Sequence, residues 1–503
     1  MPFHLVETSL SGAQGQSAEP LKIGQWLNLK LGKGVSEAGA SYLPPIFLKN
    51  AEIRAKVVRE INVDIDSSSQ EQFTYDLVYA KGWKHTLQYW IYKFMPAIVC
   101  LLFMAGTINV LYLKSFNLYF FWYKPILNIY SLTISFYILS RFFLAIFYKP
   151  PKYVGYLPDI SVIIACKNEE DSIRKTIDYV YRSDYPKTSM EVIVINDGST
   201  DGTLPEMQLA ARVYPNLTII NFEKNLGKRH GMAAGARRAK GEVLVYIDSD
   251  SFVEKGALKK IVQGFADPSV GAVCGHANVS NAKKNMLTKM QQVRYFVAFR
   301  VLKASESLFW TVSCCSGCLA AYRRSYVMEI LDTWLYQKFL GVQATFGDDR
   351  SLTNFMLRRY RVIYDSEAVC STLVPSKYYV FFTQQLRWKK SWVRETLIAC
   401  KFIWKRHPLA AFFFYMGAIF PIVAPFIVIN ALVLPLFVLN PISFLYIYGA
   451  FLMACLYSIV YLGYFRDGIW VYGVAFCFFY MLVLVWQTYY AILTVRQNHW
   501  GTR

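Results

Sequence analysis

Negatively charged residues are scarce in this chain of 503 residues. It contains 34 Asp and Glu against 54 Lys and Arg, which gives a formal net charge of +20. Such an excess fits three kinds of partner: nucleic acid, an anionic membrane face or anionic small molecules. Because charge-free apolar stretches are also present, cytoplasmic Lys and Arg under the positive-inside rule explain it most simply. We therefore expect membrane lipid as a partner and no nucleic acid.

Cysteine is scarce as well. The 10 cysteines are too few for a disulfide scaffold in a chain of this length. Cys100, Cys455 and Cys477 lie in apolar stretches, which fits a reduced, cytosol-facing protein. The first residues lack the short apolar core of a signal peptide, so secretion is not expected.

Apolar side chains, in contrast, are abundant. Hydrophobic residues make up 54% of the chain and aromatic residues 17%, and the mean hydropathy is +0.26. These values exclude a disordered or collagen-like chain and an ordinary soluble protein. They favour an integral membrane protein that carries a soluble domain.

The first part of the chain changes from polar to apolar. Residues 1–87 are polar, and β-like alternation at 51–63 and 73–80 predicts a small, β-rich cytosolic extension. Residues 94–113 form a charge-free run that is long enough for about 30 Å of hydrocarbon, and 118–148 form a second run. We expect two transmembrane helices within 88–148.

A second apolar region follows a basic, aromatic one. Residues 376–407 have the composition of amphipathic helices at a cytoplasmic membrane interface. Residues 409–465 then contain no charge, and 468–495 form another charge-free block. We expect the C-terminal transmembrane helices within 408–495. Four prolines break the first of these blocks: Pro421, Pro425, Pro435 and Pro441.

Between these regions, residues 149–375 have the pattern of a soluble α/β domain. Apolar runs at Ile160–Cys166, 191–196, Leu217–Phe222 and 242–248 predict buried strands, and amphipathic stretches separate them. This alternation predicts a doubly wound parallel sheet. In such sheets, ligands bind beyond the carboxyl ends of the strands.

Polar motifs follow these predicted strands. Asn168 and Glu169 follow the first, and the second ends in Asn-Asp-Gly-Ser around Asp197. An aspartate there suits a base N–H or a ribose hydroxyl, although an ordinary turn explains the motif as well. Lys228, next to a glycine turn, suits a phosphate, although a solvated basic surface is an equal alternative.

Two acidic pairs indicate a function more specifically. Asp248 and Asp250 follow an apolar strand with one residue between them, a spacing that suits Mg²⁺ or Mn²⁺ on a diphosphate. The alternative is an acidic cap on a helix. Asp348 and Asp349 form the second pair, where one carboxylate could act as general base toward an acceptor hydroxyl or simply begin a helix.

A third motif combines a cation with an aromatic ring. Gln384, Arg387 and Trp388 have the spacing Q-x-x-R-W. Tryptophan offers a stacking face to a sugar or base, and arginine offers a fork to a diphosphate. A belt of Trp and Arg at the membrane interface is the alternative.

Taken together in this order, the motifs over residues 90–503 resemble the processive family 2 glycosyltransferases, the group of cellulose, chitin and hyaluronan synthases. Residues 293–299, FGDDRSLTN at 346–354 and the terminal W-G-T-R resemble animal-type hyaluronan synthases. QQLRWKKS at 384–391 and CCSGCLAAYRR at 314–324 are also similar to bacterial chitin-oligosaccharide synthases. Where hyaluronan synthases have S-G-P-L, this chain has Ser316-Gly317-Cys318-Leu319, which leaves the product open.

The resemblance implies a cytosolic GT-A-type domain inserted between the transmembrane helices. It implies that Asp197 contacts uridine, that Lys228 lies near the nucleotide and that Asp248 and Asp250 hold the diphosphate with Asp250 as metal ligand. On the acceptor side it implies Asp349 as the base, with Asp348 beside it. The remaining implied binding residues are Asn168, Glu169, Ser316, Gly317, Cys318, Gln384, Arg387 and Trp388, together with Trp500 and Arg503 of a gating tail at 496–503.

The gating tail constrains the topology. The tail and the catalytic domain must both meet cytosolic UDP-sugars, so an even number of crossings must follow residue 407. We expect four crossings, with three tight ones in 409–465; two crossings and a re-entrant piece are the alternative.

The resulting prediction is a multi-pass inner- or plasma-membrane enzyme that polymerises UDP-sugars onto a growing polysaccharide and exports it. A basic, aromatic channel mouth favours hyaluronan from UDP-GlcNAc and UDP-GlcA over chitin or another N-acetylglucosamine polymer.

A channel or scaffold with a decayed nucleotide-binding domain is the contrasting class. The intact Asp250, Asp349 and Arg387 argue against it, because clustered carboxylates are costly. A lipid-linked, non-processive glycosyltransferase usually lacks Q-x-x-R-W.

Overall fold

The computed structural model describes residues 3–8, 12–17, 26–30, 52–65 and 71–79 by their backbone, isolated positions between 94 and 115, and residues 125–433, 437, 442–465 and 467–497. The chain divides into two compact units. One comprises residues 1–106 and 459–470, and the other comprises residues 107–458 and 471–503.

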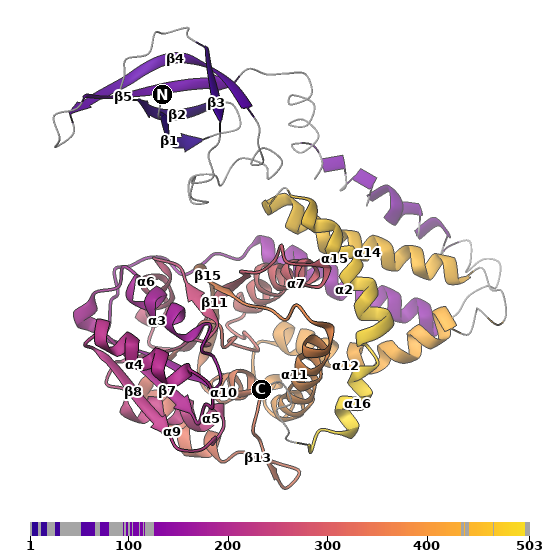
Figure 1. Cartoon of the computed structure of the whole chain (residues 1–503). Helices are drawn as coiled ribbons and strands as arrows, with labels where there is room; N and C mark the ends of the chain where they lie inside the picture. Colours follow the sequence, from indigo (N-terminus) through magenta and orange to yellow (C-terminus); the bar gives the residue numbers. More distant parts are fainter. Residues whose placement is uncertain are drawn as a thin grey trace. The chain divides into compact units, whose positions relative to one another are not determined.

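The N-terminal residues form an antiparallel sheet (Figure 1). Its strands run in the order β1-β2-β5-β4-β3. The two longest, β4 and β5, coincide with the alternation at 51–63 and 73–80. The bounds are β1 Phe3–Thr8, β2 Gly12–Ser17, β3 Trp26–Lys30, β4 Glu52–Ile65 and β5 Glu71–Tyr79.

The predicted α/β domain is present and contains an 8-stranded sheet in the order β10-β15-β11-β12-β9-β6-β7-β8. The strands predicted from the sequence are β6 to β9, which lie side by side and pair in parallel. Every residue of β6 and of β9 is buried, so helices cover both faces there. The bounds are β6 Ile160–Cys166, β7 Met190–Asp197, β8 Leu217–Phe222, β9 Val243–Tyr246, β10 Ser251–Val253, β11 Val270–Val279, β12 Ala320–Arg323 and β15 Arg361–Thr372.

The other half of the sheet is mixed rather than parallel. Strand β12 pairs antiparallel with both β9 and β11, and β10 pairs antiparallel with β15. Strands β10 and β12 were missed because they are only 3 and 4 residues long, which is too short for a visible period. Strands β11 and β15 have 10 and 12 residues, but Gly271, Gly275 and His276 interrupt the apolar pattern of β11, and Asp365 and Glu367 interrupt that of β15. A separate hairpin comprises β13 Lys338–Phe339 and β14 Val342–Gln343.

Helices alternate with the strands and complete the domain (Figure 1). Helix α5 packs closely on the sheet because its glycines face it: a Cβ on Gly235 would lie 2.5 Å from Ile163 Cγ2. The bounds are α3 Ile173–Tyr181, α4 Thr203–Val213, α5 Lys228–Arg238, α6 Ala257–Ile261, α7 Met286–Val297, α8 Ala304–Ser307, α9 Arg324–Leu335, α10 Asp348–Leu357 and α11 Tyr378–Ala399.

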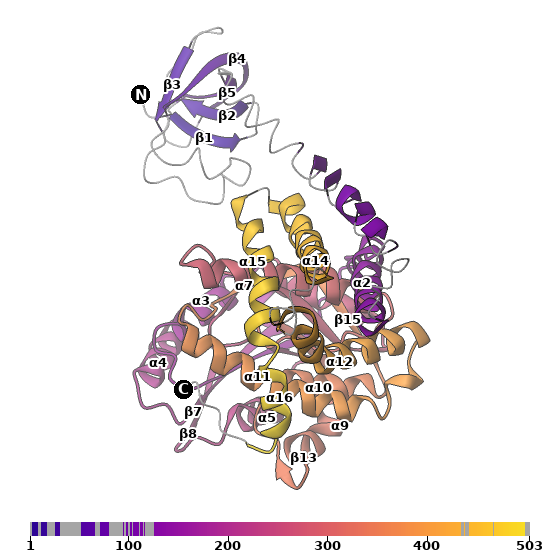
Figure 2. The ribbon, with the colours of Figure 1, turned by 90° about the vertical axis from the view of Figure 1, so that its right-hand side faces the viewer.

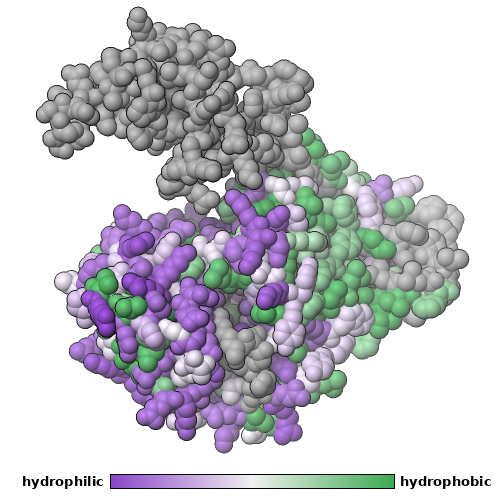
Figure 3. Space-filling view, viewed as in Figure 1, coloured by the Kyte–Doolittle hydropathy of each residue, from purple (hydrophilic) through white to green (hydrophobic). Residues whose placement is uncertain are grey.

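Apolar helices precede and follow the α/β domain, as expected. Among the described residues, Ile126–Ile146, Pro408–Ala431 and Tyr446–Phe465 are long and apolar enough to cross a membrane. Hydrophobic side chains gather over this helical part, whereas the surface of the α/β part is largely hydrophilic (Figure 3). The bounds are α2 Pro125–Ile146, α12 Pro408–Val428, α14 Ile442–Phe465, α15 Val471–Phe479 and α16 Gln487–Leu493.

The prediction of three tight crossings within 409–465 is wrong for the described residues, which form two helices, α12 and α14. Pro421 and Pro425 lie inside α12 and do not end it, because neighbouring groups satisfy the freed carbonyls of transmembrane helices. Pro435 and Pro441 lie outside the described residues. The expected span at 94–113 is described only in part, as the short apolar helix Met104–Leu113.

The last block is bent. Its two pieces, Gly468–Leu484 and Gln487–Leu493, meet at 45°. Helix α15 packs against α7, and α16 packs against α11 (Figure 2). By length and composition, this bent segment can be a broken span or a re-entrant piece.

The close approach of Gly241 to β6 gives a test of this packing. A Cβ there would lie 2.6 Å from the backbone carbon of Ile160 and the backbone nitrogen of Ser161, whereas nothing lies within 4 Å of a Cβ on Gly256. We expect Gly241→Ala to cost about 1–3 kcal/mol, as overpacking does, and Gly256→Ala to be near neutral. Equal thermal unfolding midpoints of the two variants in detergent would contradict this packing.

Candidate active site

The predicted polar motifs gather at the carboxyl ends of β6, β7 and β9. Asn168 has a left-handed backbone with φ of 54°, and its Oδ1 accepts a hydrogen bond from Thr200 N at 3.0 Å. The backbone N–H of Asn168 donates to Ser199 Oγ at 3.0 Å, and that of Glu169 donates to Thr203 Oγ1 at 2.7 Å. These bonds tie the loop after β6 to the loop after β7.

Asp197 shapes the next loop along the edge. Its Oδ1 accepts from Leu226 N at 2.7 Å, and its Oδ2 accepts from Gly227 N at 2.9 Å. Burial raises the pKa of Asp197, and these two hydrogen bonds oppose the increase. Gly227 has φ of 97°, a conformation that glycine adopts readily. The carboxylate therefore holds the turn from which Lys228 projects.

Lys228 and Asp248 form an ion pair at this edge. The Asp248 N–H donates to the Gly317 carbonyl at 2.9 Å, and a Cβ on Gly317 would lie 2.9 Å from each carboxylate oxygen of Asp248. Only a glycine therefore fits at this position without displacing the carboxylate. The loop that carries Ser316 and Cys318 is thus brought against the first acidic pair.

The negative charge of Asp250, the second member of that pair, is balanced less fully by nearby cations. Burial and the nearby Asp248 raise the pKa of Asp250 to about 7, against an opposing contribution from Lys228. Burial, Asp248 and Asp250 also raise the pKa of the Cys318 thiol to about 12. The thiol thus stays neutral and adds no charge to the acidic site.

The second acidic pair divides into a buried and a partly exposed carboxylate. Gly347, with φ of 76° and ψ of 38°, precedes α10. Asp348 is 5% exposed and accepts a hydrogen bond from Arg229 Nε at 2.9 Å. Asp349 is partly exposed, and its Oδ2 lies 3.6 Å from Cys314 Sγ. Asp348 therefore holds Arg229, and Asp349 is the more accessible of the two carboxylates.

The Q-x-x-R-W side chains lie on α11. Burial lowers the pKa of Arg387, while Asp348, Asp248 and Asp349 raise it, so this guanidinium lies within the field of both acidic pairs. Trp388 is 37% exposed, which leaves part of its ring available for stacking.

Arg294 of α7 extends this motif. Its guanidinium carbon lies 5.5 Å from the centre of the Trp388 ring, and its Nη1 donates to Gln385 Oε1 at 2.7 Å. The Gln384 Oε1 is buried and has no partner among the described residues. Gln385 therefore connects α11 to α7, while the predicted binding residue Gln384 makes no such contact through its Oε1 in the described part of the chain.

The predicted gating residues Trp500 and Arg503 lie outside the described residues. The last described residue, Gln497, accepts a hydrogen bond from Lys390 Nζ of α11 at 3.2 Å. The beginning of the predicted tail thus contacts the helix of the Q-x-x-R-W motif.

Several residues at the site were not predicted from the sequence: Arg229, Arg294, Tyr295 and Cys314. Burial raises the pKa of the Tyr295 phenol, as do Cys318, Asp250 and Asp248, which places Tyr295 beside the first acidic pair. Arg294 and Tyr295 belong to the segment 293–299, which resemblance had singled out without assigning a role. The basic pair Lys228-Arg229 was visible, but nothing local indicated that Arg229 is buried.

A divalent cation is compatible with this donor set. Asp248 and Asp250 supply hard oxygen ligands, and no group of three His, Cys, Asp or Glu side chains suited to a metal occurs among the described residues. Such a cation would complete its shell with substrate phosphates and water, as Mg²⁺ does.

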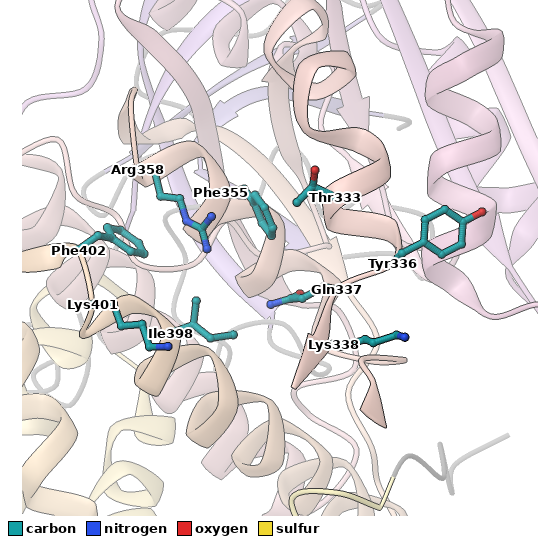
Figure 4. Close-up of a pocket in the computed structure, with 9 residues that line it drawn as sticks. All are labelled: Thr333, Tyr336, Gln337, Lys338, Phe355, Arg358, Ile398, Lys401 and Phe402. Atoms are coloured by element: carbon teal, nitrogen blue, oxygen red, sulfur yellow. The ribbon is translucent and has the colours of Figure 1, made fainter. Parts of the chain in front are cut away.

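A cavity of about 590 Å³ lies elsewhere, between the ends of α9, α10 and α11 (Figure 4). It contains none of the predicted site residues. Its lining is Thr333, Tyr336, Gln337, Lys338, Phe355, Arg358, Ile398, Lys401 and Phe402. The acidic pairs and Q-x-x-R-W, rather than this cavity, define the candidate active site.

Comparison with known proteins adds independent information. The sequence model "Glycosyl transferase family 2" matches residues 161–331. The hyaluronan synthase of Streptococcus pyogenes serotype M3 is 31% identical over 314 residues, which is 61% of this chain and 74% of that protein. An N-acetylglucosaminyltransferase of Rhizobium meliloti is 33% identical over 262 residues, which is 51% of this chain and 61% of that protein.

Among solved structures, a mannosyltransferase from Pyrobaculum calidifontis in complex with GDP-Man and Mn²⁺ is similar. It has a TM-score of 0.48 and 23% sequence identity, and the match covers 71% of this chain and 98% of that chain.

The different surroundings of the two neighbouring aspartates make their substitutions distinguishable. Asp348→Asn leaves the buried Arg229 without its charged partner, which typically costs about 3–5 kcal/mol. Asp349→Asn changes a partly exposed carboxylate and should leave the free energy of unfolding nearly unchanged. Thermal unfolding of both purified variants measures the difference. A smaller loss in Asp348→Asn than in Asp349→Asn would contradict the placement of the two side chains.

Proposed function

Because the chain belongs to glycosyltransferase family 2, we propose that it is a processive, inverting membrane enzyme. It polymerises UDP-sugars into a β-linked polysaccharide and exports the polymer. The observation that carries this proposal is the convergence of Lys228, Asp248 and Asp250 with Asp349 and Arg387 at one edge of the sheet. Cations and carboxylates together suit a diphosphate leaving group on one side and an acceptor hydroxyl on the other.

On the donor side, the loops around Asn168, Glu169 and Asp197 bind the UDP moiety, with Asp197 acting on uridine from the turn that it holds. Lys228 contacts the nucleotide phosphates. To do so, it gives up part of its contact with Asp248. Asp250, with Asp248 beside it, would hold Mg²⁺ or Mn²⁺. The bound cation would supply positive charge against the negative charge of the leaving diphosphate.

On the acceptor side, Asp349 takes the proton of the acceptor hydroxyl. The hydroxyl oxygen attacks the anomeric carbon in line, the bond from that carbon to the diphosphate oxygen breaks, and UDP departs. Arg387 stabilises the negative charge on the diphosphate. Trp388 stacks on the terminal acceptor sugar, while Gln384 and the loop Ser316-Gly317-Cys318 line the acceptor site. Trp500 and Arg503 close over the nucleotide.

The polymer that we propose is hyaluronan, made from UDP-GlcNAc and UDP-GlcA. The similarity to the streptococcal hyaluronan synthase, which extends over 74% of that protein, supports it. The cationic Arg294 beside Trp388 suits a polymer with carboxylates. The second candidate is an N-acetylglucosamine polymer, which the rhizobial relative and the motif Ser316-Gly317-Cys318-Leu319 favour.

We place the protein in the plasma or inner membrane with the α/β domain in the cytosol, where UDP-sugars are made. The cytosolic N-terminal extension, the paired helices within 88–148 and two crossings by α12 and α14 follow from this placement. The bent segment α15–α16 then stays on the cytosolic side, along α7 and α11. This arrangement keeps residues 496–503 on the side of the active site.

Donor dependence tests the polymer. Purified protein with Mg²⁺ or Mn²⁺ should release UDP continuously only when UDP-GlcNAc and UDP-GlcA are both present. Its product should be degraded by hyaluronidase. Sustained release with UDP-GlcNAc alone, and a product cut by chitinase, would replace hyaluronan by the second candidate. Absence of release with either donor or both would contradict the proposal for these sugars.

The assignment of the base has its own test. Asp349→Asn should abolish sugar transfer, because the amide takes no proton, and should leave UDP affinity within about twofold of the unsubstituted protein. Transfer is followed with radiolabelled donor and UDP affinity by calorimetry. Turnover equal to that of the unsubstituted protein would remove Asp349 from this role.

A further inference from the structure

A buried polar network joins α11 to the turn that carries Asp349. Arg394 donates from Nη2 to the Phe346 carbonyl and from Nε to Glu395 Oε1 at 2.8 Å. Asn354 Nδ2 of α10 donates to Glu395 Oε2 at 3.0 Å and to the Glu395 carbonyl at 2.9 Å. Arg394 and Glu395 are 3% and 1% exposed, so water does not compete for these bonds.

The network continues to the donor side through Gln337. Its Nε2 donates to Glu395 Oε1 at 3.3 Å, and its Oε1 accepts from Ser351 Oγ at 2.5 Å and from Arg229 Nη1 at 3.2 Å. Arg229 in turn holds Asp348. Helix α11 is thereby connected to α10 and to the helix that begins with Lys228.

Backbone packing enforces the same contact. A Cβ on Gly347 would lie 1.8 Å from Ser391 Oγ and 2.6 Å from Ser391 Cβ, and 3.2 Å from Arg394 Nη2. The Gly-Asp-Asp turn therefore rests directly on α11, with no room for a side chain between them.

Helix α11 also carries the Q-x-x-R-W side chains. Arg387 precedes Arg394 by seven residues, about two helical turns, so the two project from similar sides of the helix. One rigid helix thus presents Arg387 and Trp388 to the substrate and fixes the turn of Asp349.

We infer that Glu395 and Arg394 are positioning residues for sugar transfer, which set the Asp349 carboxylate relative to Arg387 and Trp388. This inference rests on the proposed function. Stability alone does not explain a buried ion pair, because well-packed apolar residues are often as stabilising or more so. Placement does explain it, because an error of about 1 Å at a reacting group can cost about a hundredfold in rate.

Glu395→Gln tests the inference, with Glu191→Gln as the matched control. Glu191 lies at the opposite end of the sheet, where its Oε1 accepts from Ser161 Oγ and from Lys240 N, both at 2.5 Å. We expect Glu395→Gln to lower kcat at least tenfold, with donor KM and UDP affinity within twofold of the unsubstituted full-length protein. Glu191→Gln should keep all three values. A folded Glu395→Gln variant whose kcat is within twofold of that of Glu191→Gln would overturn the inference.

If Glu395→Gln is not recovered folded, the contact at Gly347 provides the deciding measurement. Gly347→Ala should lower kcat at least tenfold, because the new methyl group pushes the turn away from α11; the positive φ of 76° adds a backbone strain that a change at Ser391 does not relieve, so only partial rescue is expected. Adding Ser391→Gly removes the obstructing side chain and should restore at least a third of the lost rate; Ser391→Gly alone is the control. No restoration would overturn the inference. Inactivity of the unsubstituted protein toward every donor would instead contradict the proposed function.

Discussion

Compensation of negative charge in a largely buried site is the constraint on which the catalytic domain depends. Four aspartates lie there, and the cost of burying their negative charge is offset to different extents. Asp248 pairs with Lys228, and Asp348 pairs with the fully enclosed Arg229. Burial and the neighbouring Asp248 raise the pKa of Asp250 to about 7, and Lys228 opposes this rise only in part. The uncompensated part of the charge is what a divalent cation would neutralise.

The first two residues of α5 are the cations that pair with two of these aspartates. Lys228 and Arg229 are adjacent in sequence, but they project in different directions and reach acidic pairs that are a hundred residues apart in the chain. Asp197 fixes the turn before them, and the glycine face of α5 lets the helix approach the sheet. The packing of one short helix therefore sets the charge balance of the whole site.

The features predicted from the sequence are those that short stretches of residues determine. Strands β6, β7 and β9 were found because β-branched runs buried on both faces are distinctive. Strand β8 was found as well, but the expectation that it is buried is wrong, because it lies at the edge of the sheet and only its Leu217 is buried. The mixed half of the sheet was missed because β10 and β12 are short and because glycines and polar residues interrupt the apolar pattern of β11 and β15. The prolines of α12 were misread because a membrane tolerates them. Asp348 and Asp349 could not be distinguished either, since the partner that buries Asp348 lies 119 residues away along the chain. The contact of Gln385 with Arg294, across 91 residues of the chain, could not be predicted for the same reason.

The course of the chain through α10, β15 and α11 keeps one part of the site together along the sequence. The motifs after β6, β7 and β9 are spread between residues 168 and 250, whereas Asp349, Arg387 and Trp388 lie within one continuous stretch that also contains most of the network of Glu395. In evolutionary terms, such a stretch can be exchanged between related chains as a unit. Recombination there would carry over the spacing of Asp349 to Arg387 and Trp388 unchanged, while the loops before β10 are inherited from the other parent.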